Sequence, residues 1–219
     1  MKKLVLSIIF MLGFATTSYA TSSVGFTISN ADINSTVTDD IDSNGTTDTT
    51  KDISNGITFA SIFFEKALSD NMSVGVDFIP FEAEFESRST TQSSIKEKGS
   101  STTSGTNKGT ADVSKHLTFY IQPQKEIRDG LKVFGTLGFV RADVESLVQS
   151  VSSTDKTVEQ DLDGMKLGLG LKKETGGGFI KLEYSETDYD DISTTTSNNT
   201  KVTADIDTDI LALSVAKSF

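Results

Sequence analysis

The chain has 219 residues and no cysteine, so disulfide bridges and thiolate metal sites are excluded. It carries 20 basic and 31 acidic residues, for a formal net charge of −11. The phosphates of nucleic acid and of an anionic membrane surface repel such a chain, which argues against both as simple electrostatic partners.

The first twenty residues predict a secretory signal peptide. Lys2 and Lys3 precede an apolar stretch over residues 4–15, and Ser18 and Ala20 place small residues before a cleavage point. The apolar stretch is too short to be a membrane-spanning helix. We therefore expect cleavage after Ala20, which leaves residues 21–219 as one exported domain.

Eight segments of the remaining chain alternate between apolar and small or polar residues, which is the pattern of β-strands. No apolar run near the roughly 18 residues of a spanning helix follows the signal, so a membrane-embedded form would have to cross as strands. The alternating segments are residues 24–29, 57–63, 72–78, 116–122, 131–139, 165–172, 180–185 and 211–219.

The connections between these segments are alternately long and short. The long ones cover residues 39–55, 87–112, 148–161 and 187–200, and the short ones residues 67–71, 124–130 and 175–178. This wiring predicts an all-β fold, an up-and-down antiparallel transmembrane β-barrel of eight strands with four long outer loops and three short periplasmic turns. Residues 87–112 could hold another hairpin, but their Gly, Ser, Thr and Lys composition lacks apolar alternation, so we predict a loop.

The face opposite the apolar residues carries glycine or charge in most of these strands. A soluble barrel has its apolar face inside, and a solvent-facing surface has no reason to select glycine in mid-strand, where it weakens the strand. We therefore predict that the apolar face meets lipid. An eight-stranded interior is just wide enough for side chains, which favours a plug of salt bridges over an ion path. The predicted polar residues of the lumen are Asp77, Lys166, Lys172, Lys181 and Glu183.

The last strand carries the signal with the clearest family resemblance. Leu211, Leu213 and Val215 alternate along a segment that stops at Phe219, and it resembles the C-terminal signal that the barrel-assembly machinery reads. Lys217 departs from the pattern, because the family usually has an aromatic or apolar residue there. With its signal peptide and loop pattern, the chain resembles the opacity-protein and OmpA-like family of eight-stranded outer-membrane barrels. The resemblance implies a monomer in the outer membrane of a Gram-negative bacterium, in contact with membrane lipids and lipopolysaccharide.

The first long loop resembles a calcium-binding loop. Asp40, Asp42, Asn44 and Asp48 offer oxygen ligands near Gly45, as in the loop that wraps calcium. Lys51 stands where a bidentate glutamate belongs, so we expect weak calcium binding at best, with a solvated acidic loop as the alternative. Acidic residues at 188–191 and 205–209 predict a hydrated outer surface, with divalent cations bridging to lipopolysaccharide as the other interpretation. No other cofactor is predicted.

The sequence favours a protein that is not an enzyme. His116 is the single histidine, and its surroundings, Ser114-Lys115-His116, match no enzyme motif of this scaffold. We predict a structural or surface-interaction role through the outer loops. The alternative is a small porin-like channel for ions or small solutes. Strand number separates the two, because eight strands close the lumen and ten or more begin to open it.

Overall fold

The computed structural model describes residues 21–219 except 41–43, 82, 97–101, 150–155 and 196–200. The predicted signal peptide lies outside these residues. None of the described residues belongs to a helix long and apolar enough to cross a membrane. The elements, in chain order, are β1 (Ser22–Asp40), β2 (Thr49–Ser69), β3 (Met72–Phe78), β4 (Ala83–Lys96), β5 (Thr102–Arg128), β6 (Leu131–Gln149), β7 (Lys156–Thr175), β8 (Gly178–Tyr189), β9 (Ile192–Thr195) and β10 (Lys201–Ser218).

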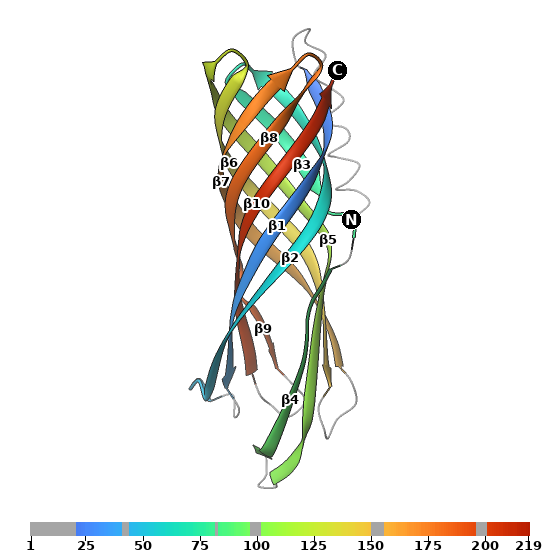
Figure 1. The fold of residues 1–219 in the computed structure, drawn as a ribbon. Coiled ribbons are helices and arrows are strands. Elements are labelled where there is room, and N and C mark those ends of the chain that lie inside the picture. Colours follow the sequence, from blue (N-terminus) through green and yellow to red (C-terminus); the bar gives the residue numbers. More distant parts are fainter. Residues whose placement is uncertain (1–20, 41–43, 82, 97–101, 150–155, 196–200) are drawn as a thin grey trace.

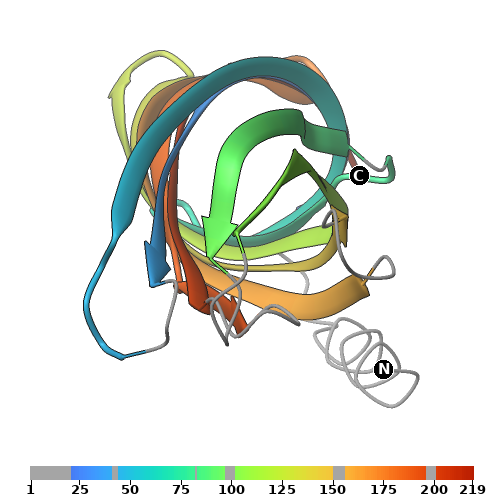
Figure 2. The same cartoon turned by 90° about the horizontal axis from the view of Figure 1, so that it is seen from below.

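The described strands close into a ring of eight (Figures 1 and 2). Antiparallel pairing runs β1-β2-β3-β5-β6-β7-β8-β10, and β10 pairs back onto β1 from Ser23–Ser218 to Asp40–Lys201. Two further strands continue interrupted ones. β4 pairs with β5 beyond the end of β3, and β9 pairs with β10 beyond the end of β8. The predicted all-β, up-and-down antiparallel barrel of eight strands is confirmed.

The strands are longer than the sequence predicts. β1 has 19 residues, β2 has 21 and β5 has 27, whereas crossing a bilayer takes about 9–11. The prediction of a loop over residues 87–112 is wrong. Most of these residues form the β4–β5 hairpin, which lies at the end of the barrel far from the short turns (Figure 1). Apolar alternation marks only strands with one apolar face. In a hairpin rich in serine and threonine, the backbone hydrogen bonds are made between the two strands, and they require no apolar alternation in the sequence.

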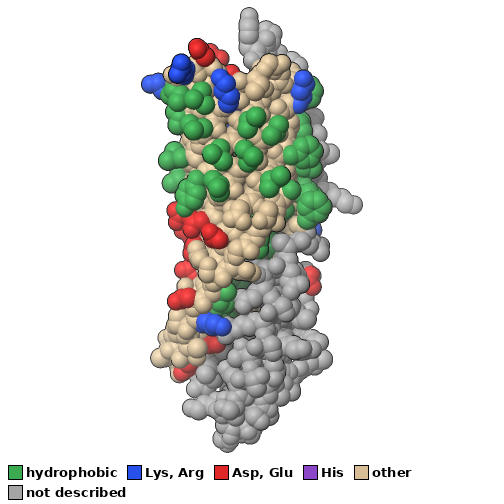
Figure 3. All heavy atoms as spheres, in the orientation of Figure 1, with side chains coloured by type: hydrophobic (Ala, Val, Ile, Leu, Met, Phe, Trp, Pro, Cys, Tyr) green, Lys and Arg blue, Asp and Glu red, His purple; other side chains and the backbone are tan. Residues whose placement is uncertain are grey.

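An apolar belt covers the half of the barrel nearest the short turns, and Figure 3 shows one face of it. Leu169 on β7 is 70% exposed and Phe26 on β1 is 66% exposed, while Thr27 and Ser29 beside Phe26 are buried inside. Apolar side chains outside and polar side chains inside invert the arrangement of a soluble barrel, as predicted. The belt consists of outward residues that include Val24, Phe26, Ile28, Ile62, Phe78, Leu137, Phe139, Met165, Leu167, Leu169, Leu182, Leu211, Leu213 and Val215.

β2 departs from the predicted facing. In the predicted segment 57–63, the apolar residues of the alternation are Ile57, Phe59 and Phe63, which places them toward lipid. In the structure Phe63 is 2% exposed and points into the lumen, whereas Ile62 is outward. A shift of one residue in a strand exchanges its two faces, and Phe63-Phe64 offers an aromatic residue for either phase. Phe63 fits inside because Gly25 lies opposite, where an added Cβ would stand 2.5 Å from the Phe63 ring. A Cβ at Gly75 would likewise overlap the Tyr120 ring.

The interior changes character beyond the belt. Inside the belt it is polar, with buried serine, threonine, lysine and glutamate side chains. Farther from the short turns, the ring encloses an apolar cluster in which Val140 is 1% and Ala142 0% exposed. The extended strands therefore have a core of their own and are more than loops. Its buried members are Ile33, Val140, Ala142, Val144, Leu162, Tyr189 and Ile206.

Candidate functional site

An ion cluster centred on Glu65 lies across the lumen. Its Oε1 is 2.8 Å from the Lys172 Nζ, and its Oε2 is 2.8 Å from the Lys181 Nζ. The three side chains come from β2, β7 and β8, so the cluster connects strands on different sides of the ring. Tyr120 also donates to Glu65 Oε2, at 3.4 Å. All of these side chains are buried, and a carboxylate shared by two ammonium groups holds them in a single arrangement.

Aromatic rings enclose the two lysines. The Lys172 Nζ lies 4.0 Å from the centre of the Phe179 ring, and the Lys181 Nζ lies 4.6 Å from that of Phe63. The two rings are 6.1 Å apart, and Phe134 is buried on the β6 side. Cation–π contacts of this kind strengthen where water is excluded. The rings therefore fill the lumen around the cluster as well as stabilising its positive charge.

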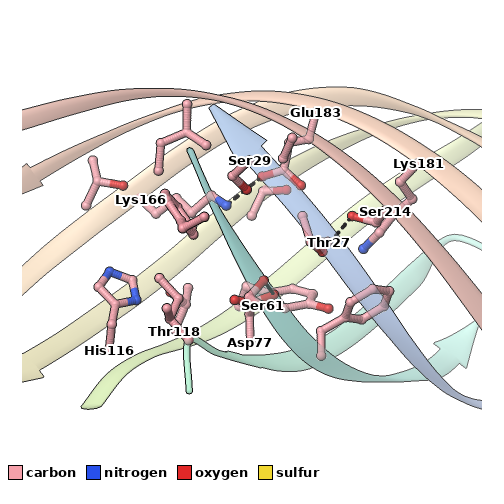
Figure 4. A pocket seen from close by; sticks show the side chains of 18 of the residues that line it. Thr27, Ser29, Ser61, Asp77, His116, Thr118, Lys166, Lys181, Glu183 and Ser214 are labelled. Carbon is pink, nitrogen blue, oxygen red and sulfur yellow. Dashed lines mark hydrogen bonds and ion pairs between the residues drawn. The ribbon is translucent and has the colours of Figure 1, made fainter. Parts of the chain in front are cut away.

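A second group of polar side chains continues the network toward the apolar core (Figure 4). Lys166 and Glu183 form an ion pair at 2.9 Å, and Ser61 donates to Asp77 at 2.8 Å. Gln122 links the two groups, because its amide nitrogen donates to Glu183 at 3.4 Å and its amide oxygen accepts from Lys181 at 3.4 Å. The network thus contains three lysines and three acidic residues: Lys166, Lys172 and Lys181 with Glu65, Asp77 and Glu183.

The network separates two cavities. On the short-turn side, a vestibule of about 630 Å³ reaches inward to Glu65, Lys172 and Phe179. On the other side, a cavity of only about 50 Å³ is lined by Lys181, Glu183 and further polar residues. The ion cluster and its rings lie between them, so the geometry is that of a plug.

The structure brings the predicted lumen residues together. Lys166, Lys181, Glu183 and Asp77 line one cavity, and Lys172 joins them through Glu65. Glu65 itself was missed by the sequence reasoning. The signal for it was the alternation of Ser61, Phe63 and Glu65, which becomes visible once β2 is read in the opposite phase.

The predicted calcium ligands are only partly described, since Asp42 lies outside the described residues. The Asp40 carboxylate accepts the backbone N–H groups of Asn44, at 3.0 Å, and Gly45, at 2.8 Å. Gly45 has a positive φ of 87°, which suits the sharp turn. Asp48 bonds through its backbone to Asp39 at 2.8 Å. The Asp40 carboxylate thus closes the turn through hydrogen bonds to its backbone, and calcium binding stays a prediction.

Several outward acids beyond the belt contact neighbouring side chains. Tyr184 donates to Asp209 at 2.5 Å, and Asn34 donates to Asp207 at 3.1 Å. Arg141 forms two hydrogen bonds to Asp163, each 2.6 Å long, and these bonds hold the pKa of that carboxyl below its usual value. Asp188, Asp190, Asp191 and Asp205 are exposed, which fits the hydrated acidic surface that the sequence predicts.

His116 lies where the polar lumen meets the apolar core. A bulge in β5 at Lys115, with φ of 53°, precedes it, and its side chain points inward (Figure 4). Its Nε2 is 3.1 Å from the Tyr189 hydroxyl oxygen. Burial raises the pKa of Tyr189 to about 12, so this hydroxyl keeps its proton at neutral pH.

The C-terminal residues lie on the outer surface of β10. Leu211, Leu213 and Val215 are outward members of the apolar belt, and Phe219, at 78%, is the most exposed large apolar residue among those whose burial the structure describes. Phe219 is tied to the start of the barrel, because its backbone N–H donates to Ser22 at 2.8 Å. The predicted assembly residues thus share one outward row at the seam where β10 meets β1.

These observations define the class of protein: a membrane-spanning β-barrel whose lumen is filled by buried ionic and aromatic side chains. No protein-family model matches the sequence, and no curated protein matches it. Solved structures match in fold. The outer membrane protease OmpT from Escherichia coli is 8% identical with a TM-score of 0.50, and the match covers 93% of this chain and 98% of that one.

Other outer-membrane barrels match as well. Neisserial surface protein A is 11% identical with a TM-score of 0.39, over 89% of this chain and 97% of that one. Ail, the attachment invasion locus protein of Yersinia pestis, is 12% identical with a TM-score of 0.36, over 86% and 98%. Such identities concern the fold alone. The chain shares the outer-membrane β-barrel fold, as the predicted family resemblance implies.

Proposed function

We propose that this protein is an integral outer-membrane barrel of a Gram-negative bacterium, with a structural and surface-interaction role and neither channel nor enzyme activity. The observation that carries the proposal is the sealed lumen. Glu65 holds Lys172 and Lys181 at 2.8 Å each, with aromatic rings packed around them. An ion passing through would have to break buried charge pairs, which costs several kcal/mol each.

The length of the strands supports the surface role. β1, β2, β5, β6, β7 and β10 all run well past the apolar belt, and the β4–β5 hairpin extends farther still (Figure 1). A barrel needing only to anchor itself could end near the belt. A further part of the proposal is that residues 1–20 are removed, that the barrel-assembly machinery inserts the chain as a monomer, and that its outer half lies among lipopolysaccharide.

Single-channel conductance of the refolded residues 21–219 in a planar bilayer tests the sealed lumen. We expect no steady openings from protein whose insertion is verified by protease protection. The matched variant is Phe63→Ala with Phe134→Ala, which removes two rings from the plug and should give measurable conductance. Steady openings of the unaltered barrel would support the porin alternative and overturn the proposal.

A second experiment tests the surface role separately. In the native host, deletion of the gene is complemented either by the whole barrel or by a barrel whose β4–β5 hairpin is shortened. We expect both to restore resistance of the outer membrane to detergent, and only the whole barrel to restore attachment to surfaces or other cells. Equal attachment by both would show that the extended strands play no part in it.

A further inference from the structure

A row of lysines follows the short-turn border of the apolar belt. Lys125 lies on β5, Lys173 on β7 and Lys217 on β10, and all three residues are exposed. Lys173 continues the outward row of Leu171 by two residues, and Lys217 continues that of Val215 in the same way. Figure 3 shows basic side chains at this border on the face that it presents. The row therefore belongs to the outer surface and is separate from the lysines of the lumen.

The three lysines lie at nearly one height along the barrel axis, on every second strand of the ring. From Lys173, pairing leads across β8 to Val215, and Lys217 stands two residues farther toward the short turns. The step from Lys125 to Lys173 is the same. With strands that lean as Figure 1 shows, at a tilt of about 40°, crossing two strands lowers the height by about 6 Å, and two residues along a strand restore about 5 Å. The displacement thus offsets the tilt.

Two of the ammonium groups reach toward the short turns. The Lys173 Nζ donates to the Asp129 carbonyl oxygen, in the β5–β6 turn, at 2.5 Å. A Cβ added at Gly177, in the β7–β8 turn, would stand 3.1 Å from the Lys217 Nζ. Lysines at a membrane border take this arrangement, with the stem along apolar surface and the ammonium group beyond it. Phe219, 78% exposed and two residues beyond Lys217, indicates that this level is the interface, where aromatic residues of such barrels lie.

Within the described part of the chain, no ion pair joins these three ammonium groups to an acidic side chain. Of the acidic residues near the turns, Glu174 pairs with Lys132 of the vestibule at 2.6 Å, and Glu126 accepts a backbone N–H of its own turn at 2.7 Å. At the opposite border of the belt, the outward rows of β7 and β10 reach Asp163 and Asp209 instead. On these strands the two borders of the belt therefore carry opposite charge.

We propose that this lysine row binds the phosphate headgroups of anionic phospholipids of the phosphatidylglycerol class, in the leaflet on the short-turn side. The proposal rests on insertion of the barrel into a membrane. A lysine near a membrane surface favours an anionic lipid by a factor of about five. A zwitterionic headgroup carries its own ammonium group beside the phosphate and gains less from the row. The row thus selects anionic lipid at this border and fixes the height at which the belt sits in the bilayer.

Quenching of a single tryptophan by brominated lipid measures this preference, because the chain has no tryptophan of its own. Ile180→Trp places the reporter on β8, paired with Lys173 on one side and with Val215, which precedes Lys217 on the outward face, on the other. Residues 21–219 with this change are refolded into vesicles of phosphatidylcholine and brominated phosphatidylglycerol. We expect a binding constant for phosphatidylglycerol about five times that for phosphatidylcholine, and equal constants overturn the proposal. Quenching by brominated phosphatidylcholine alone verifies insertion, so failed insertion is told apart from absent selection.

Two variants of the reporter protein assign the preference to the row. Lys173→Gln with Lys217→Gln should bring the ratio of the two constants close to one, whereas Lys51→Gln with Lys201→Gln removes two exposed lysines at the far end of β2 and β10 and should leave it unchanged. A second reporter, Leu211→Trp, lies outward at the opposite border of the belt and should show no preference. Heat-resistant mobility on gels checks that each variant is folded. An unchanged ratio in the first variant, or an equal preference at the second reporter, overturns the proposal.

Discussion

Replacing Glu65 with glutamine tests whether the ion cluster stabilises the barrel. The substitution keeps the shape of the side chain but removes the charge shared by Lys172 and Lys181, whose side chains are only 6% and 4% exposed. Removing one partner of a buried ion pair costs about 3–5 kcal/mol, because the remaining charge is left without compensation. Here two ammonium groups lose the same partner, so we expect a loss of at least about 3 kcal/mol in the free energy of unfolding.

The assay is urea unfolding of the barrel in phospholipid vesicles, followed by far-ultraviolet circular dichroism because the chain has no tryptophan. Glu186→Gln is the matched control, since it makes the same chemical change at an exposed position on β8. A triple variant, Glu65→Gln with Lys172→Met and Lys181→Met, removes all three charges together and should recover most of the loss. A Glu65→Gln effect below about 1 kcal/mol, or one equal to the control, would refute the reasoning.

Two further predictions follow from other contacts. Gly75→Ala places a methyl group against the Tyr120 ring and should lower the free energy of unfolding by about 1–3 kcal/mol. Gly135→Ala, whose nearest neighbour is 3.8 Å away, is the control, and equal effects of the two in the same urea titration would contradict this account. Arg141→Gln should raise the pKa of Asp163 toward its ordinary value, measured by carbon NMR of the carboxyl group. Because Arg141 lowers that pKa in the folded barrel, the stabilisation by Asp163 is present above its unfolded pKa and is lost as the pH falls through its folded pKa. A barrel with Arg141→Gln should lack this loss, and an unchanged Asp163 resonance in the variant would contradict it.

The fold could be read from the sequence where a strand has one apolar and one polar face. β7 and β10 met that condition, because Leu167, Leu169, Leu211 and Leu213 all face outward as predicted. β2 did not. Its paired phenylalanines fit either phase, and only the packing of Phe63 against Gly25 from β1 decides between them. Such a contact joins residues far apart in the sequence, so no local pattern contains it.

The candidate site could be predicted in its residue types but not in its centre. Lys166, Lys181 and Glu183 stand on the face opposite clear apolar alternation, which identified them as lumen residues. Glu65 follows Phe63-Phe64, so its direction depended on the ambiguous phase of β2. The long outer strands escaped prediction for a different reason. Beyond the belt, apolar residues such as Val140 point inward. Serine and threonine occupy the outward face there, and such polar residues are typical of loops, so the sequence predicts loops in this part of the chain.

The tip of the extended β1–β2 pair lies so far from the lumen network that changes at the tip should not alter the stability of the barrel. The ten residues from Ala31 to Asp40 rise about 33 Å along the strand, which is far beyond the distance at which substitutions usually couple. Changes at the exposed turn near Thr46 and Thr47 should therefore leave the lumen network unaffected. Exposed turns of small polar residues also tolerate inserted sequence. The pair thus provides a long hairpin on which foreign peptides, such as epitopes or affinity tags, can be displayed well clear of the bilayer.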